Sequence, residues 1–226
     1  MNFGVRLLEA MRWMSHHYTF DFFLRLDDDY FLCLERMLNE LSCLLVSSTQ
    51  QSPIYAGTRA CGTVPYMDEA YILLSSVVVD RILAASDLEC SGFGSLTAAA
   101  WLRIGGPGNP QGDVAWVRDY RLDWTGGSWR RVKPNDRACG QLMGFHRTYP
   151  DEMNELWEEI SRGMNVSQSI ADDCKNTLLY EDDGHCPSTS RGVDVELRDR
   201  LQKDNAQPCD SFHPRDNTVW CGRQGC

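Results

Sequence analysis

The stretch Phe20-Asp21-Phe22-Phe23-Leu24-Arg25-Leu26-Asp27-Asp28-Asp29-Tyr30-Phe31 joins an apolar run directly to three consecutive aspartates. A short run rich in Phe and Leu is typical of a buried strand. Beyond it, Leu and Met recur at helical spacing from Leu34 to Leu45, which predicts a helix to about Val46. The aspartates are therefore expected at the C-terminal tip of a strand in an α/β sheet, where such sheets bind ligands.

Three adjacent carboxylates indicate a site for a divalent cation. They repel one another, and burying them without compensation would cost roughly several kcal/mol. A cation relieves that cost, and hard oxygen ligands favour Mg²⁺ or Mn²⁺ over Zn²⁺. A metal held in this way can neutralise a diphosphate leaving group. The alternative is a solvated acidic turn, but the apolar strand before the triplet and the amphipathic helix after it favour the metal site.

Composition limits the class of protein. The chain has 226 residues, of which 42% are hydrophobic, enough for one sizeable domain with or without an appendage. Its net charge of −10 argues against binding to nucleic acid or to an anionic membrane. Ten cysteines without a CxxC pair predict disulfides in an oxidising compartment. The glycosylation sequon Asn165-Val166-Ser167 fits a secretory lumen.

The remaining pattern alternates helices and strands up to about residue 170. Helices are predicted over Phe3–Met14, after Ser75, over Thr97–Ile104 and from Pro150. The residues expected to face inward are Val78, Ile82 and Leu83 in the second of these helices, and Met153, Leu156, Trp157, Ile160 and Met164 in the last. Strands are predicted over Ile54–Thr58, Asp113–Val117 and Cys139–His146. His16 and His17 are expected in a polar turn after the first helix.

The composition changes near Ala171. The sequence becomes polar, rich in Cys, Asp and Arg, and loses periodicity. We therefore expect two parts, a domain over residues 1–170 and a small disulfide-stapled appendage over residues 171–226. His185 and His213 do not match a zinc-ligand spacing with the neighbouring cysteines, so zinc is a minor alternative here.

Taken in order, these motifs resemble glycosyltransferase family 31, the β-1,3-galactosyltransferase-like and Fringe-related hexosyltransferases. The matching pieces are Leu7–Trp13, Phe23–Phe31, Tyr55-Ala56-Gly57, Pro65-Tyr66, Ala70-Tyr71-Ile72-Leu73, Ala99-Ala100-Trp101-Leu102, Asp113-Val114 with Val117 and Asp119-Tyr120-Arg121-Leu122, and Cys139 with Gln141-Leu142 and Phe145-His146. Each piece is modest alone, and it is their common order over residues 3–160 that carries the resemblance.

The resemblance implies a GT-A fold, which is a Rossmann-like α/β sheet. It implies an inverting transfer of a sugar from a UDP-sugar donor to a glycan or glycoprotein acceptor, with Mn²⁺, in the Golgi lumen. The N-terminal strands of the nucleotide-binding half and the membrane anchor of such enzymes are expected to be missing from this chain. Contact with a membrane would then occur only through that absent anchor.

The family's site residues carry over position by position. The third aspartate of the motif binds the metal, which corresponds to Asp29, and a late histidine is a second ligand in Fringe-like members, which corresponds to His146. Asp27 and Asp28 are expected against the ribose and the water shell of the metal. Arg25 and Tyr71 lie within the matching motifs and are expected in the nucleotide-sugar site.

The chain departs from the family at the catalytic base. The resemblance places an aspartate where Gly94-Ser95-Leu96 stands, and a serine cannot deprotonate an acceptor hydroxyl without a base of its own. The candidate for the catalytic base is Asp113, because Gly112-Asp113-Val114 superficially resembles the missing motif. Its spacing from Ser75 is too long, however, and its neighbours match the next strand, so a carboxylate at the start of that strand is the alternative. The family's glycines before Tyr71 are also replaced, by Asp68-Glu69-Ala70.

Two functions of different class therefore stand. One is an active UDP-sugar-dependent hexosyltransferase whose base is unidentified. The other is a catalytically inactive relative that binds nucleotide or glycan as an interaction module, which Ser95 and the altered glycines favour and the intact Asp triplet disfavours. A third, weaker reading, an extracellular Cys-rich adhesion protein, depends on the tail alone.

Overall fold

A computed structural model gives the fold of most of the first two thirds of the chain and of short pieces beyond. The residues that it describes are 2–47, 53–61, 65–86, 88–91, 94–103, 114–118, 122–123, 139, 143–162, 180–182, 203 and 207–209. The sequon at Asn165 and the histidines His185 and His213 lie outside them.

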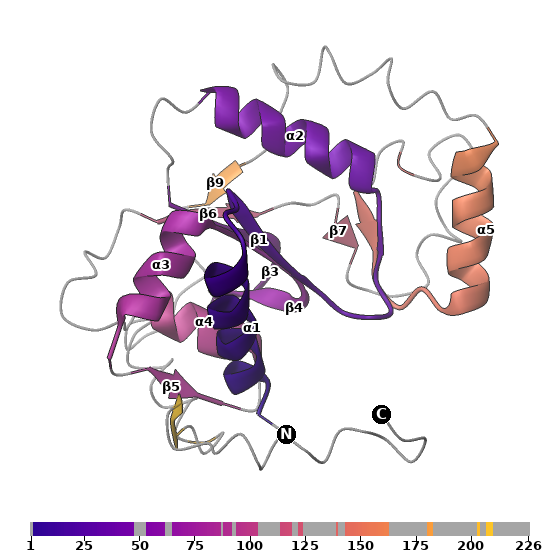
Figure 1. The fold of residues 1–226 in the computed structure, drawn as a ribbon. Coiled ribbons are helices and arrows are strands. Elements are labelled where there is room, and N and C mark those ends of the chain that lie inside the picture. The colour runs from indigo at the N-terminus through magenta and orange to yellow at the C-terminus, as the bar shows by residue number, and fades with distance from the viewer. Residues whose placement is uncertain are drawn as a thin grey trace.

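Five helices and ten strands make up these parts (Figure 1). The helices are α1 (Phe3–His17), α2 (Leu34–Ser47), α3 (Ser76–Ala84), α4 (Gly94–Arg103) and α5 (Pro150–Ser161). The strands are β1 (Phe22–Leu26), β2 (Phe31–Leu32), β3 (Ile54–Cys61), β4 (Pro65–Ser75), β5 (Glu89–Cys90), β6 (Ala115–Arg118), β7 (Leu122–Asp123), β8 (Gly144–Phe145), β9 (Tyr180–Asp182) and β10 (Gln207–Pro208).

The main sheet has the strand order β1-β4-β3-β6-β9. Only β3 and β6 pair in parallel, and the other three pairs are antiparallel. The chain is thus of mixed α/β class, while the GT-A topology stays a prediction. Strand β4 lies inside the sheet, which explains its unbroken run of Tyr, Ile and Leu: a strand covered on both faces needs no polar alternation.

Helices cover both faces of this sheet. Helices α1, α3 and α4 pack against one face, where Ile72 and Leu74 of β4 are fully buried. Helix α2 packs against the other, where Tyr71 and Leu73 point. In Figure 1, α2 lies on one side of the strands and the other three helices lie on the opposite side. The predicted strand before the Asp triplet and the helix after it are confirmed.

Helix α1 is longer than its sequence pattern predicts. It continues to His17, so the prediction that His16 and His17 lie in a turn beyond the helix is wrong. The physical reason is that nothing before Tyr18 breaks the helix, and the ring of Trp13 stacks on that of His17 with centroids 4.6 Å apart. Histidines in a last helical turn also face the negative end of the helix dipole.

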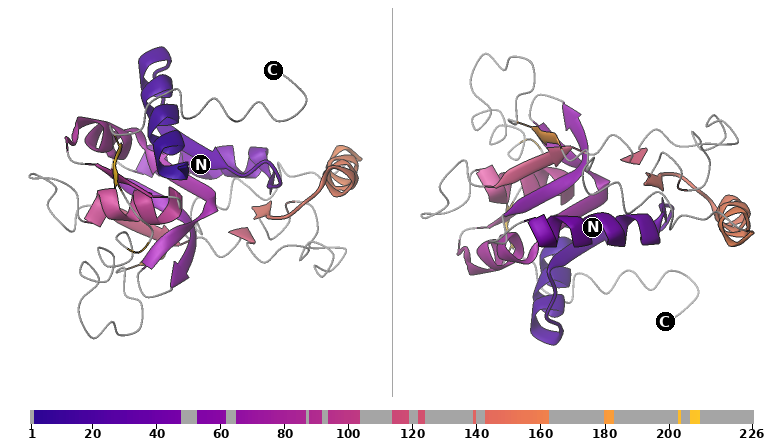
Figure 2. Two further views of the ribbon diagram at one scale, coloured as in Figure 1. Left: turned by 90° about the horizontal axis from the view of Figure 1, so that it is seen from below. Right: turned by 90° about the horizontal axis from the view of Figure 1, so that it is seen from above.

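Within the described part of the chain, helix α5 packs along a narrow stripe. Leu156 is fully buried there, whereas the side chain of Trp157, predicted to face inward, is 65% exposed. That prediction is wrong because α5 lies at one side of the molecule, away from the main sheet (Figures 1 and 2), and among the described residues it packs on a small cluster around Cys33 and Phe145. A single stripe of contacts has no room for a residue adjacent to Leu156.

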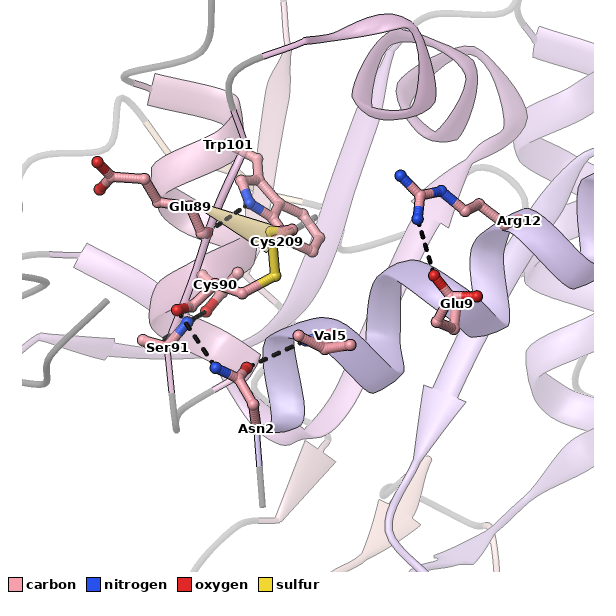
Figure 3. Close-up of a disulfide and its surroundings, with 10 residues drawn as sticks. Asn2, Val5, Glu9, Arg12, Glu89, Cys90, Ser91, Trp101 and Cys209 are labelled. Carbon is pink, nitrogen blue, oxygen red and sulfur yellow. Dashed lines mark hydrogen bonds and ion pairs between the residues drawn. A yellow bond between two sulfur atoms is a disulfide. The ribbon is translucent and has the colours of Figure 1, made fainter. Parts of the chain in front are cut away.

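The described parts of the predicted appendage, residues 171–226, pair with strands of the first part of the chain. Strand β9 pairs with β6, and β10 pairs with β5. A disulfide joins Cys90 to Cys209, beside the indole of Trp101, which donates a hydrogen bond to the carbonyl of Glu89 (Figure 3). A second disulfide joins Cys33 to Cys139, so the prediction of disulfides is confirmed for these four cysteines.

No helix within the described part of the chain has both the length and the apolar character needed to cross a membrane.

Candidate metal centre

The three aspartates form a tight turn at the end of β1. The amide of Asp27 donates to the carbonyl of Ala70 on β4, and the amide of Tyr30 donates back to the carbonyl of Asp27. This turn stops the strand and gives the three carboxylates different surroundings. Asp27 and Asp29 are half-buried, and Asp28 is exposed.

A short antiparallel pair brings the late histidine to this turn. Strand β2 follows the turn and pairs with β8, with Phe31 opposite Phe145. One step beyond that pair, the same register places Tyr30 opposite His146. The amide of Thr148 also donates to the carbonyl of Asp29, at 2.8 Å, so the two segments stay together past the end of the strands. The sequence pattern predicts the strand that ends at His146 but not the short strand β2 that receives it.

Asp27, Asp29 and His146 converge on one point. Nε2 of His146 lies 3.4 Å from Oδ1 of Asp29 and 3.6 Å from Oδ2 of Asp27, and all three potential ligand atoms lie within 4.8 Å of one another. Neighbouring ligands of an octahedral ion with bonds near 2.1 Å are separated by about 3 Å, so only small movements are needed to enclose one. Two carboxylates and an imidazole are a donor set that Mn²⁺ accepts.

Arg25 holds one of these carboxylates. Its Nη2 lies 2.5 Å from Oδ1 of Asp27, which leaves the other oxygen of Asp27 directed to His146. Burial raises the pKa of the Asp27 carboxyl, Arg25 and His146 counter part of this rise, and the charge of Asp29 adds to it. A half-buried carboxylate that has lost hydration gains more from a nearby cation than an exposed one does.

Tyr30 fixes the place of the His146 ring. The two rings stack with centroids 6.0 Å apart and planes inclined by 24°, and the ring of Tyr71 lies 6.0 Å from that of Tyr30 at a tilt of 47°. Gly144 makes this arrangement possible, because a Cβ at that position would lie 2.3 Å from Cε1 of Tyr30. Sequence reasoning missed both Tyr30 and Gly144, since an isolated glycine and a tyrosine after the triplet carry no periodic signal.

The Cys33–Cys139 disulfide anchors the same region. The amide of Cys33, just after β2, donates to the carbonyl of Met143, just before β8, and Nη1 of Arg36 donates to the carbonyl of Cys139. The disulfide therefore joins the two segments that carry the aspartates and His146.

The other predicted site residues lie away from the convergent ligand atoms or outside the described residues. Tyr71 is buried in the core behind Tyr30 and is not among the convergent atoms, and Asp28 is not part of the convergent group. The backbone of Ser95 belongs to α4, but its side chain lies outside the described residues, as does the whole of Asp113.

No protein-family model matches this sequence, and no curated protein matches it significantly. The candidate centre therefore stands on its geometry.

Proposed function

We propose that this chain is a Mn²⁺-dependent hexosyltransferase that transfers a sugar from a UDP-sugar to a glycan or glycoprotein with inversion. The observation that carries the proposal is the convergence of Asp27, Asp29 and His146 from two segments far apart in the sequence. An acidic turn that is merely solvated has no need of a histidine directed at two of its carboxylates. The two disulfides are consistent with action in an oxidising lumen such as the Golgi.

The chain's own residues have distinct roles in this proposal. Asp27, Asp29 and His146 would hold the ion by three ligands and leave its other positions for the donor. Arg25 orients Asp27, and Tyr30 orients His146. When bound, the ion supplies positive charge that stabilises a diphosphate leaving group.

A substitution within the Asp triplet tests this site. We expect Mn²⁺, followed by electron paramagnetic resonance, to bind the parent chain and to bind Asp29→Ala at least tenfold more weakly, because one of three ligands is lost. UDP, titrated calorimetrically, should bind the parent only with Mn²⁺ present. Asp28→Ala is the matched control: it removes the same charge from the same turn, outside the convergent group, and should bind Mn²⁺ as the parent does.

The same experiment separates the metal centre from its alternative. The distances also suit a protonated His146 shared between two carboxylates, without any metal. In that case the parent would show no specific Mn²⁺ signal, or Asp28→Ala and Asp29→Ala would weaken it equally. Either result would contradict the proposed function.

One observation favours a second candidate, an inactive relative that binds nucleotide or glycan. Ser95 stands where the resemblance places the base, and a serine does not accept a proton at neutral pH. We expect Ser95→Asp to create or raise sugar transfer from a UDP-sugar, measured as UDP release, by at least tenfold if the parent lacks its base. Transfer by the parent that Ser95→Asp does not raise would show that the base lies elsewhere and would exclude the inactive relative. The control is Ser95→Asn, which has nearly the same size but cannot act as a base.

A further inference from the structure

Strand β4 contains a bulge close to the candidate metal centre. Gly57 of β3 pairs with Ile72, but two residues further along β3 Arg59 pairs with Met67. Residues 68–71 of β4 therefore lie opposite a single residue of β3. A bulge redirects the side chains of its strand, and bulges are over-represented next to active sites.

Two features fix the shape of this bulge. Oδ1 of Asp68 accepts a hydrogen bond of 2.9 Å from the amide of Ala70, which turns the chain around Glu69. Gly57 leaves room for the turn, because a Cβ at that position would lie 2.5 Å from the carbonyl oxygen of Tyr71. The resemblance places glycines in this turn, so Glu69 is a carboxylate that distinguishes the chain from the family.

The bulge brings Glu69 next to the candidate metal centre. The amide of Asp27 donates to the carbonyl of Ala70 at 3.2 Å, so a candidate metal ligand is hydrogen-bonded to the neighbour of Glu69. Glu69 also lines the same pocket as Arg25, whose Nη2 binds Asp27. Glu69 is not in the convergent group of ligand atoms found among the described residues. It therefore lies beside the centre without belonging to it.

The pocket that Glu69 lines lies between α1 and the sheet and has a volume of about 230 Å³. Phe3, Leu7 and Ile72 form an apolar part of its wall, and the half-buried Glu69 contributes a carboxylate. Pockets for drug-sized ligands occupy about 300–1,000 Å³, so this one has room for about one sugar ring. Its apolar wall suits the C–H groups of such a ring, and the carboxylate suits a hydroxyl.

A carboxylate in this place meets a requirement of the proposed function. In an inverting displacement, the acceptor oxygen approaches the anomeric carbon from the side opposite to the diphosphate, which lies at the metal. The base must therefore stand beside the metal centre and not within it. Ser95 cannot act as this base, because a serine does not accept a proton at neutral pH.

We propose that Glu69 is the general base of this reaction, an inference that rests on the proposed function. Its carboxylate accepts the proton of the acceptor hydroxyl while the hydroxyl oxygen bonds to the anomeric carbon. The bond between that carbon and the diphosphate oxygen breaks, and its electron pair leaves with UDP. The alternative is that Glu69 only balances the charges of Arg6 and Arg25, which line the same pocket.

Glu69→Gln tests the base, because glutamine has the size of glutamate but does not accept a proton. The probes are UDP-galactose, UDP-glucose and UDP-N-acetylglucosamine, each given to the full chain with Mn²⁺ and with water as the acceptor. We expect the parent to release UDP from at least one probe, and kcat to fall about 100-fold or more in Glu69→Gln with KM for the donor unchanged. Formate should restore UDP release in Glu69→Ala by supplying a carboxylate from solution. A failure of formate to do so would show that the role of Glu69 is structural and would overturn the inference.

Asp68→Asn is the matched control. It removes the same charge from the same bulge, its side-chain oxygen can still accept from the amide of Ala70, and it should leave UDP release unchanged. Electron paramagnetic resonance should show that Glu69→Gln binds Mn²⁺ as tightly as the parent does, since Glu69 is outside the convergent group.

The outcomes separate this inference from the proposed function. Undiminished UDP release by Glu69→Gln, an equal loss in Asp68→Asn, or weaker Mn²⁺ binding by Glu69→Gln would overturn the inference alone. Absence of UDP release by the parent with all three probes would instead contradict the proposed function, and the inference with it.

Discussion

Replacing Cys33 and Cys139 together by alanine is expected to lower the free energy of unfolding by about 4 kcal/mol, because a disulfide restricts the unfolded chain and a loop of roughly 100 residues gives an entropic contribution near 4.7 kcal/mol. Here the joined residues are 106 positions apart. Typical domains are stable by only about 5–15 kcal/mol, so this is a large share of the total. Urea denaturation with and without the bond measures it.

The same variant should also lose the candidate metal centre. Cys33 follows β2 and lies against Met143 next to β8, so the bond holds the pairing that sets His146 beside Asp29. We expect Mn²⁺ affinity to fall at least tenfold even under conditions where the variant stays folded.

The Cys90–Cys209 bond provides the control for this effect. Its residues are 119 positions apart, so removing it should cost about the same stability by the same entropic reasoning. It joins β5 to the residue that follows β10, and neither strand carries a residue of the candidate metal centre. Mn²⁺ affinity should therefore persist in Cys90→Ala with Cys209→Ala. Equal loss of affinity in both double variants would show that the Cys33–Cys139 bond has no specific role at the site.

Gly144→Ala is expected to destabilise the fold by about 3 kcal/mol, the upper part of the usual range for overpacking a buried site. The new Cβ would lie 2.3 Å from Cε1 and 2.7 Å from the hydroxyl oxygen of Tyr30. Tyr30 is buried, and the centroid of its ring lies 6.0 Å from those of Tyr71 and His146. The displaced Tyr30 ring should push the His146 ring aside, and Mn²⁺ should then bind at least tenfold more weakly.

A double-mutant cycle isolates this contact. In a Tyr30→Leu background the ring atoms that meet the new methyl group are absent. There, adding Gly144→Ala should lower the free energy of unfolding by less than about 1 kcal/mol. Chemical denaturation gives the four stabilities, and electron paramagnetic resonance gives the Mn²⁺ affinities. If Gly144→Ala costs the same in both backgrounds, the backbone rather than the Tyr30 ring limits that position, and the proposed support of His146 by Tyr30 is wrong.

The sequence predicted the local elements near the site well, for a physical reason. An apolar run followed by charges can bury itself only as a strand that ends where the charges begin, and β1 ends at Leu26 as expected. The same reasoning predicted helices where apolar residues repeat with helical period, as in α1 and α3. It failed at Trp157 and at His16 because periodicity does not say how much of a helix finds a partner or where an unbroken helix stops.

Within the candidate site, the sequence by itself determined the chemistry of the donors. The Asp triplet at a strand end predicted a divalent-cation site from the residues alone, whereas His146 was expected as a ligand only from the resemblance to glycosyltransferase family 31. The resemblance placed Asp27 against the ribose and the metal's water shell, whereas its side chain lies in the convergent group with Asp29 and His146.

Only the tertiary structure decided which side chains meet. The pairing of β2 with β8 brings His146 to Asp29, and Gly144 leaves room for the Tyr30 ring that supports it. The tertiary structure also places Arg25 so that it pairs with the carboxylate of Asp27 and lines a pocket under α1. These contacts join residues distant in the chain, and their register follows from packing and disulfide closure, which local periodicity does not encode.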